Sequence, residues 1–379
     1  MRLAVNAWFW DRPTTGSGQY THRLVEGLAA LDPTLEILLI APRGLGVATR
    51  PFSSASPPEP LMPEISAGPT KIWFEQVAFP RACARLAVDL AHVPYWGSPL
   101  QPPVPTMVTI HDLIPRLLPA YRGGPLVRAY TALVTRSARK APLALTDSAV
   151  SRCDIIDHLH LSAQHVRAIP LAADARYDPR PSPQDVQVRS RYGVSGRYVL
   201  YLGGFDVRKN VGAAIQAYAQ ALAGLDEQLT LVIAGRLPER DTAFAPDPRH
   251  VIEGLGPEDG RVRTIGFVEE PDKPALYRGA MAFIFPSRYE GFGLPPLEAL
   301  ACGTPVVAGD RGSLPEVVGE AGVLVDPDDI PAMARALARL ATDGELRAEL
   351  SRRAIKQASR FSWHRTASET LAAYREALA

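Results

Sequence analysis

Residues 198–225 read YVLYLGGFDVRKNVGAAIQAYAQALAGL and combine an apolar strand, a glycine turn and a helix. The run 198–204 has strand length, and residues 211–225 repeat apolar side chains at helical spacing. A strand that is apolar throughout is typical of a parallel sheet covered by helices on both faces. The stretch therefore predicts an α/β fold.

The same alternation of strands and helices extends in both directions along the chain. A helix is expected at 20–31, and the chain after Asp328 is rich in Ala, Leu and Arg, which favours helix to the end. Further strands are expected at 2–7, 35–41, 104–110, 144–146, 166–170, 229–234, 263–267, 281–286 and 305–308.

At 379 residues the chain is too long for one hydrophobic core, so two domains with a cleft between them are expected. The Pro-rich stretch 174–187 separates the two series of strands and predicts the hinge there, with domains at 1–175 and 176–359. A second stretch crowded with Pro, Ser and Ala, 51–69, predicts a mobile loop.

The bulk composition excludes several classes of partner. Lys plus Arg number 41 against 40 Asp plus Glu, a net charge of +1, so no global field attracts nucleic acid or an anionic membrane. The three cysteines, Cys83, Cys153 and Cys302, form no disulfide or metal-binding pattern. The N-terminus lacks the apolar stretch of a signal peptide, and we expect a cytoplasmic protein without membrane spans.

Ligands of open parallel sheets bind beyond the carboxyl ends of the strands, and the loops that leave strands are therefore the candidate sites. The first is 14–19, where Gly16 and Gly18 let a ligand approach the backbone before a helix. A flexible turn explains these glycines equally well.

His111 and Asp112 follow an expected strand. His111 is a candidate catalytic residue, the alternatives being that it packs in the core and that Asp112 caps the next turn.

A third loop, 203–210, places Arg208 and Lys209 before a helix that Asn210 is expected to cap. Two cations at a positive helix end repel each other unless an anion joins them, which favours a phosphate site over a solvated basic turn.

The fourth loop runs from Phe285 to Leu300 and carries Glu290 and Glu298 around a Gly-Phe-Gly-Leu-Pro-Pro segment. A carboxylate can accept both hydroxyls of a ribose, and free N–H groups of the glycine loop can bind sugar hydroxyls or phosphate. Arg208, Lys209 and helix N-termini would offset the charge of a departing diphosphate, a role that a divalent metal often has. No cluster with metal-ligand spacing occurs, and residues 326–328 are interpreted as a helix cap, so no metal is expected.

At these loops the sequence resembles glycosyltransferase family four, whose members are retaining enzymes of the GT-B fold. Glu290 and Glu298 match the E-x7-E motif of the family, and the similarity continues through 303–308 and 312–316. The resemblance covers essentially the whole chain. It implies two Rossmann-like domains with parallel sheets facing a cleft, and a closing helix at about 360–379, after Phe361, Ser362 and Trp363, that crosses back to complete the N-terminal domain.

The resemblance also implies roles for the candidate residues. Glu298 holds the ribose and Glu290 contacts the donor hexose. His111 touches the donor sugar near its reacting face, and Lys209 binds the diphosphate. The amides of Gly291, Phe292, Gly293 and Leu294 bind sugar hydroxyls and phosphate, and the Gly16 and Gly18 loop lies against the donor phosphates and the acceptor.

One position departs from the family pattern: Gly204 stands where many members carry Arg. A subgroup that includes mannosyltransferases of cell-surface polysaccharide synthesis has a triplet like Arg208–Lys209–Asn210, and this chain also shares its segments at 73–76 and 92–94. The resemblance therefore favours GDP-mannose over UDP- or ADP-sugars as the donor, with Arg208 assisting Lys209.

The expected function is a metal-independent hexosyltransferase that acts on a glycan or a lipid-linked glycan and needs no other cofactor. A lipid-linked acceptor would bring it into peripheral contact with the inner face of the membrane. Two alternatives are a sugar-nucleotide 2-epimerase of the same fold and a catalytically silent sugar-nucleotide binding protein. The E-x7-E loop and the Arg-Lys-Asn turn argue against the epimerase, and the intact candidate residues argue against the silent protein.

Overall fold

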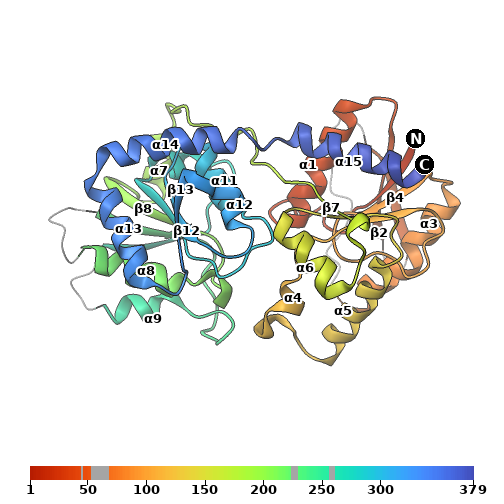
Figure 1. Cartoon of the computed structure of the whole chain (residues 1–379), viewed down its shortest axis with the longest axis horizontal. Helices are drawn as coiled ribbons and strands as arrows, with labels where there is room; N and C mark the ends of the chain where they lie inside the picture. The colour runs from red at the N-terminus through yellow and green to blue at the C-terminus, as the bar shows by residue number, and fades with distance from the viewer. Residues whose placement is uncertain (44–45, 53–67, 223–228, 256–260) are drawn as a thin grey trace. The chain divides into compact units, whose positions relative to one another are not determined.

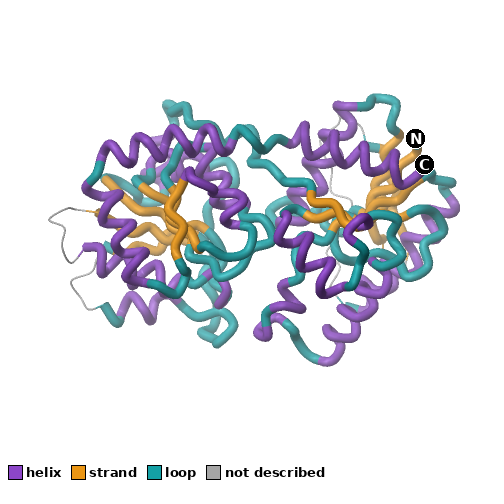
Figure 2. Tube along the Cα trace, viewed as in Figure 1, coloured by secondary structure: helices purple, strands orange, loops and turns teal. Residues whose placement is uncertain are grey.

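The computed structural model describes residues 1–43, 46–52, 68–222, 229–255 and 261–379. These residues form two compact units, Met1–Leu171 with Ser362–Ala379, and Ala172–Phe361 (Figure 1). In each unit the helices cover both faces of one sheet (Figure 2), which confirms the predicted α/β class.

The sheet of the first unit has the strand order β3-β2-β1-β4-β5-β6-β7. All pairs are parallel except β2 with β3, which is antiparallel. The strands are β1 Arg2–Asn6, β2 Glu36–Arg43, β3 Gly46–Pro51, β4 Leu90–Val93, β5 Thr106–Thr109, β6 Ala144–Thr146 and β7 Val166–Ala168.

The helices of this unit include a π-helical turn at Phe74–Ala78 between α2 and α3. The α-helices are α1 Gly16–Leu31, α2 Pro69–Trp73, α3 Phe79–Arg85, α4 Ile114–Leu117, α5 Pro125–Ala138, α6 Ala149–Leu159 and α15 Trp363–Leu378. Of the loop predicted at 51–69, residues 53–67 lie outside the described part of the chain; Pro51 ends β3 and Pro69 begins α2.

The second unit has a parallel sheet in the order β10-β9-β8-β11-β12-β13. Its strands are β8 Arg197–Leu202, β9 Leu229–Ala234, β10 Val262–Gly266, β11 Ala282–Phe285, β12 Val306–Gly309 and β13 Gly322–Val325. Its helices are α7 Asp185–Arg191, α8 Val211–Leu222, α9 Pro248–Glu253, α10 Lys273–Gly279, α11 Leu294–Ala301, α12 Leu314–Val318, α13 Ile330–Thr342 and α14 Gly344–Ala358.

The Pro-rich stretch 174–187, where we expected the hinge, belongs to the second unit, and its last residues already form α7. Side-chain contacts fix it there: the Arg278 guanidinium donates to Asp185 at 2.8 Å, and the Tyr177 ring packs edge-on against Tyr277. The contacts divide the chain earlier, between Leu171 and Ala172.

The closing helix completes the first unit, as the resemblance implied. Ser362 caps α15 by accepting from the Arg365 N–H, so Trp363 is the first residue of the helix and does not precede it. The helix is fixed by specific contacts: a Cβ at Gly27 of α1 would lie 2.8 Å from Ala367 Cβ, and the Thr366 hydroxyl donates to the Pro170 carbonyl. The Tyr374 hydroxyl meets Nδ1 of the buried His92 on β4 at 2.6 Å.

Candidate active site

The basic turn follows β8 at its carboxyl end. Residues Val207–Lys209 form one 3₁₀ turn, and Asn210 has a left-handed backbone, with φ 55°, before α8 begins at Val211. The prediction that Asn210 caps α8 is wrong: within the described residues its side-chain amide donates to the Pro327 carbonyl at 2.6 Å and does not reach back to the helix. The turn is thereby tied to the chain before α13.

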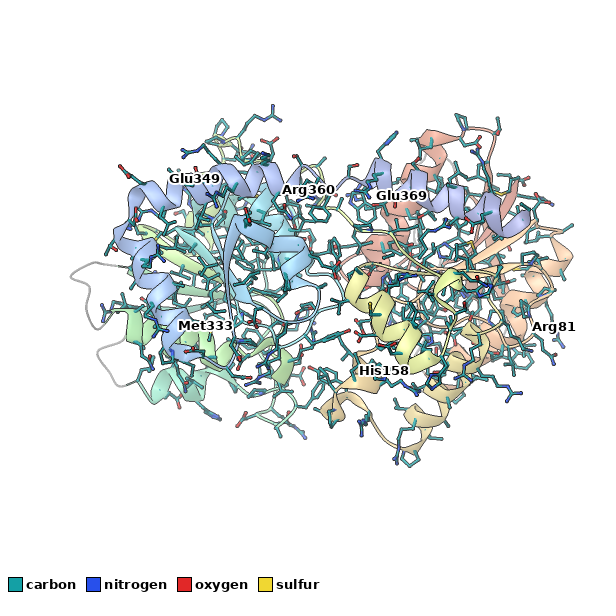
Figure 3. The ribbon with its side chains drawn as sticks, viewed as in Figure 1. Arg81, His158, Met333, Glu349, Arg360 and Glu369 are labelled. Carbon is teal, nitrogen blue, oxygen red and sulfur yellow. The ribbon has the colours of Figure 1, made fainter. Side chains whose placement is uncertain are left out.

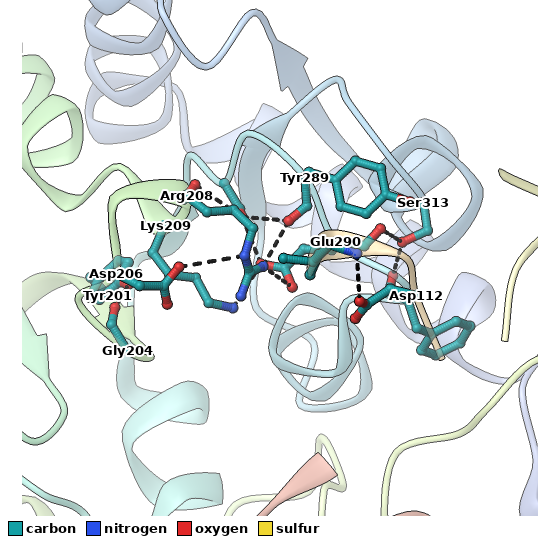
Figure 4. A network of polar contacts seen from close by, with 12 residues as sticks. Asp112, Tyr201, Gly204, Asp206, Arg208, Lys209, Tyr289, Glu290 and Ser313 are labelled. Carbon is teal, nitrogen blue, oxygen red and sulfur yellow. Dashed lines mark hydrogen bonds and ion pairs between the residues drawn. The ribbon is translucent and has the colours of Figure 1, made fainter. Parts of the chain in front are cut away.

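Arg208 and Lys209 both bind the carboxylate of Glu290 (Figure 4). The Arg208 guanidinium lies 2.7 Å from Oε2 and the Lys209 ammonium 2.7 Å from Oε1. Arg208 also donates to the Tyr289 carbonyl and is only 11% exposed. Arg208 is therefore packed against Glu290 and is not a solvated charge.

Glu290 is buried and ionised. Burial raises the pKa of its carboxyl, but Lys209 and Arg208 lower the pKa by a larger amount, so that it lies below the usual value. The Ser287 hydroxyl adds a hydrogen bond of 2.6 Å to Oε1. Because one carboxylate holds two cations, Glu290 fixes their position at the end of the sheet.

The backbone after Glu290 is held in place by the turn before α12. The Ser313 hydroxyl donates to the carbonyls of Glu290 and Phe292, at 3.0 and 2.6 Å. Gly312 has φ 63°, and a Cβ there would lie 2.8 Å from the backbone of Glu290. Only glycine allows this close approach.

The glycine loop ends in the first turn of α11. Gly293 precedes the helix with φ 105°, which favours glycine, and Pro295 and Pro296 occupy its first turn as predicted. Phe292 is buried against the Phe361 ring. Leu294 is the first helical residue, so its N–H is one of the free donors of a helix N-terminus.

Glu298 lies in α11 and has different partners from Glu290. Its Oε2 accepts from the Tyr277 hydroxyl at 3.0 Å, while the nearby Tyr177 hydroxyl donates to Glu270 at 3.4 Å. Burial raises the pKa of Glu298 to about 6. The two carboxylates of the motif thus differ: Glu290 is neutralised by cations, whereas Glu298 is a buried acid beside tyrosines.

His111 in the first unit follows β5 and pairs with Asp147, which follows β6. His111 Nδ1 lies 2.7 Å from the Asp147 carboxylate, and Nε2 lies 3.2 Å from the Pro94 carbonyl. Burial lowers the pKa of His111, but Asp147 raises it more, so that the pKa lies above the usual value. The Tyr20 ring packs edge-on against the imidazole.

Asp112 makes the local contact that the capping alternative described. Its carboxylate accepts from the Ile114 N–H at 2.9 Å, at the start of α4.

The Gly16 and Gly18 loop is a helix turn. We expected a loop up to residue 19, but Thr15 caps α1 by accepting from the Gly18 N–H, and the helix begins at Gly16. Gly18 has a packing reason, because a Cβ would lie 2.0 Å from the Arg12 carbonyl oxygen. At Gly16 a Cβ would meet nothing within 4 Å, so packing does not require glycine there.

Sequence reasoning missed several residues of these clusters, above all Asp147, Ser287 and Tyr277. Asp147 directly follows a strand, and the rule that selected His111 would also have selected it. Tyr277 is inside α10, where no sequence signal distinguishes it from a core residue. Gly204, whose missing charge we noted, contributes its carbonyl as the acceptor of the Tyr201 hydroxyl.

The segment 73–76 contributes a buried acid to the first unit. Glu75 forms an ion pair with Lys71 and accepts from the Tyr130 hydroxyl at 2.9 Å. The Lys71 ammonium also lies 4.7 Å from the centre of the Tyr95 ring.

Comparison with known proteins places the chain in a family. The family described as Glycosyltransferase Family 4 matches residues 14–177, and Glycosyl transferases group 1 matches residues 190–357. O-antigen chain mannosyltransferase B of Escherichia coli is 31% identical over 96% of this chain and 96% of that protein. The chain belongs to glycosyltransferase family four. Serotype-specific mannosyltransferase WbdA of Escherichia coli is also 31% identical, over 70% of this chain but only 32% of that larger protein.

Solved structures of other glycosyltransferases share the fold of this family-four chain. Sucrose-phosphate synthase from Thermosynechococcus elongatus aligns with a TM-score of 0.74 at 24% identity, over 99% of this chain and 98% of that one. WaaG, a glycosyltransferase involved in lipopolysaccharide biosynthesis, aligns with a TM-score of 0.70 at 15% identity, over 98% of both chains. The fold is therefore GT-B, and membership of family four makes the chain a glycosyltransferase.

In the described ranges of this glycosyltransferase, no group of three or more His, Cys, Asp or Glu side chains could hold a metal ion. Asp326 and Asp328, predicted to cap, both bind Arg311. Asp326 also accepts from the Asp328 N–H at 2.9 Å, but the residue that caps α13 is Asp329. None of the described helices is both long and apolar enough to cross a bilayer.

Proposed function

We propose that this glycosyltransferase is a retaining, metal-independent mannosyltransferase that uses a nucleotide-diphosphate sugar, with GDP-mannose favoured. The acceptor is a hydroxyl of a glycan or a lipid-linked glycan in the cytoplasm, and a lipid-linked acceptor would bring the enzyme to the inner face of the membrane. Similarity along the whole chain to O-antigen chain mannosyltransferase B supports the sugar and the acceptor class.

The observation that carries the proposal is the pair of cations on Glu290. Arg208 and Lys209 leave the same turn and share one buried carboxylate at the end of β8 and β11. In the bound state the diphosphate also contacts the two cations, and both of them stabilise its negative charge as the sugar departs. The protein thereby supplies the charge that a divalent metal supplies in other transferases.

The remaining roles follow from the chemistry of each group. The ionised Glu298 accepts from the ribose hydroxyls, Glu290 contacts the hexose, and the amides of 291–294 donate to sugar hydroxyls and phosphate. Gly204 leaves space for the phosphates beside the turn. The turn that contains Gly16 and Gly18 contacts the donor phosphates and the acceptor, and the space beside Gly16, where a Cβ would meet nothing within 4 Å, admits them.

His111 acts on the transferred sugar. The Asp147 carboxylate holds Nδ1 and fixes the orientation of the ring, so that the Nε2 edge can meet a sugar hydroxyl in place of the Pro94 carbonyl. The imidazole is then a positioned donor near the reacting carbon.

The test is a thermal-shift screen of GDP-, UDP- and ADP-sugars followed by transfer assays. A ligand that binds only the folded state raises the melting temperature, and we expect GDP-mannose to do so most. Transfer to a mannan-type acceptor supports the proposal. Epimerisation of donor incubated alone, or donor binding without transfer to a broad panel of acceptors, would establish one of the two alternatives.

A further inference from the structure

A pocket in the first unit lies among α4, α5 and α6, far along the chain from the basic turn of the second unit. Its volume is about 500 Å³, and its polar lining consists of Arg116, Arg122, Arg128, Thr131 and His158. Arg116 is on α4, Arg122 in the connection to α5, and Arg128 on α5. His158, labelled in Figure 3, lies near the end of α6. Among the described residues no Asp or Glu lines the pocket.

The arginines of this pocket differ from most others in the chain. Arg23 pairs with Glu26 at 2.7 Å, and Arg167 pairs with Glu376 at 2.6 Å. Within the described ranges, the guanidinium groups of Arg116, Arg122 and Arg128 have neither an ion pair nor a hydrogen bond. Like charges around one cavity repel each other, and an anion in the cavity removes that repulsion.

We propose that this arginine pocket, defined by Arg116, Arg122 and Arg128, binds a phosphate or diphosphate group. The planar guanidinium fork matches two oxygens of a phosphate. Three guanidinium groups carry more positive charge than a singly charged carboxylate ligand would balance, which favours a phosphate or diphosphate as the ligand. The pocket is a second anion site, separate in the chain from the proposed donor site at Arg208 and Lys209.

Neighbouring apolar side chains give this anion two sources. Leu126 and Val127, at the start of α5, are 87% and 46% exposed. Apolar side chains beside an anion pocket suit a phosphate that is carried by a lipid, whereas the pocket alone suits a free phosphate or diphosphate. The chemistry of recognition is the same, and experiment separates the two sources.

The first experiment measures which arginines a free anion protects. The full chain is treated with the arginine reagent phenylglyoxal, with and without inorganic diphosphate, and modified peptides are quantified by mass spectrometry. We expect diphosphate to slow modification of Arg116, Arg122 and Arg128 several-fold and to leave the exposed Arg85 and Arg335 unchanged. Because the signal is read at each arginine, binding at Arg208 is observed separately, and failure of the proposed donor site is distinguishable from failure of this one.

The second experiment compares two triple variants with equal loss of charge. One carries Arg116→Gln, Arg122→Gln and Arg128→Gln, and the control carries Arg85→Gln, Lys140→Gln and Arg335→Gln at exposed positions outside the pocket. Both are titrated with inorganic diphosphate by calorimetry and floated with phosphatidylcholine vesicles with and without phosphatidylglycerol. Circular dichroism melts check that both remain folded.

Each outcome decides the proposal. A loss of at least about tenfold in diphosphate affinity in the pocket variant alone, which is the size expected for a lost charge-assisted hydrogen bond, identifies a free phosphate site. Loss of binding to the phosphatidylglycerol vesicles in the pocket variant alone identifies a lipid phosphate. If the pocket variant matches its control with both probes, and diphosphate protects none of the three arginines, the proposal is wrong.

Discussion

At the scale of the residue, the two carboxylates of the E-x7-E motif have opposite electrostatics. Glu290 has its pKa lowered, on balance, by Lys209 and Arg208, whereas burial raises the pKa of Glu298 to about 6. Glu298 therefore destabilises the free protein when it ionises, and the proposed contact with the ribose accounts for its presence. An ionised carboxylate is a stronger acceptor for hydroxyl donors than a protonated one, and keeping it buried lowers the stability of the fold.

This difference predicts opposite effects of Glu298→Gln on stability and binding. The folded pKa lies above the usual value of 4.5, so the free protein is most stable when Glu298 is protonated and loses about 2 kcal/mol as pH rises from 4.5 through 6. We expect Glu298→Gln to raise Tm at pH 8 and to weaken nucleotide diphosphate binding by about 1.5 to 3 kcal/mol. The wild-type affinity should rise with pH through about 6, and that of the variant should not.

Calorimetry against pH measures the Tm and the affinity, with the exposed Glu345→Gln as the control. A variant that binds as tightly as wild type would show that Glu298 does not hold the ribose.

His111 and Asp147 give a second prediction at this scale. We expect His111→Ala to lower kcat strongly while nucleotide binding stays nearly unchanged, because a contact used in the transition state appears in kcat. Asp147→Asn should lower the pKa of His111, since Asp147 raises it more than Asp112 or the Pro94 carbonyl does. Steady-state kinetics and a histidine NMR titration measure the two effects, with His165→Ala as the control. Near-normal turnover of His111→Ala would restrict the residue to packing.

At the scale of the element, the ends of β8 and the start of α8 at Val211 were predictable, but the start of α1 was not. The predicted strand at 198–204 ends within two residues of β8, because an apolar run stops where burial stops. The helix start at Gly16 was missed because two glycines are typical of a loop. The residue that caps the helix is Thr15, directly before the first of these glycines. The strand β4, Leu90–Val93, was missed because it has four residues and contains the buried polar His92.

Contacts between elements were harder still to predict. The sequence placed Arg208 beside Lys209 and Glu290 in another loop, but nothing in it revealed that both cations reach the same carboxylate. That contact depends on β8 and β11 being neighbours in the sheet, although they are far apart in the chain. The candidate residues were therefore predictable one by one, and their pairing was not.

The basic turn gives the prediction at this scale. We expect Arg208→Ala and Lys209→Ala each to lose at least about 2 kcal/mol of transition-state stabilisation in kcat/KM, comparable to the loss of one oxyanion donor. Arg311→Ala is the matched control, because Arg311 binds Asp326 and Asp328 and does not contact Glu290. An Arg208→Ala enzyme within a few-fold of wild type would leave Lys209 and the backbone amides as the only diphosphate ligands.

At the scale of the whole molecule, each unit has its own set of chemical groups. The first unit holds the His111–Asp147 pair, and the second holds both cations and both carboxylates of the motif. The closing helix α15 joins the ends of the chain by packing on α1, so the first unit is complete only when the last residues have been added. Stability of the His111 site therefore depends on residues more than two hundred positions away in the sequence.

The division of groups predicts the chemistry of the complete enzyme. The proposed site draws the positive charge for the leaving diphosphate from Arg208, Lys209 and the N-terminus of α11, and on that proposal transfer should continue in EDTA at an unchanged rate. The family relationship predicts that the new glycosidic bond keeps the anomeric configuration of the donor. Transfer from GDP-mannose, with and without EDTA and with added magnesium or manganese, measures the first expectation, and NMR of the product's anomeric proton measures the second.

Loss of activity in EDTA that magnesium or manganese restores would refute metal independence and leave the two cations as auxiliary ligands. An inverted product would instead refute the proposed retaining mechanism, and the separation of the two readouts shows which of the two statements has failed.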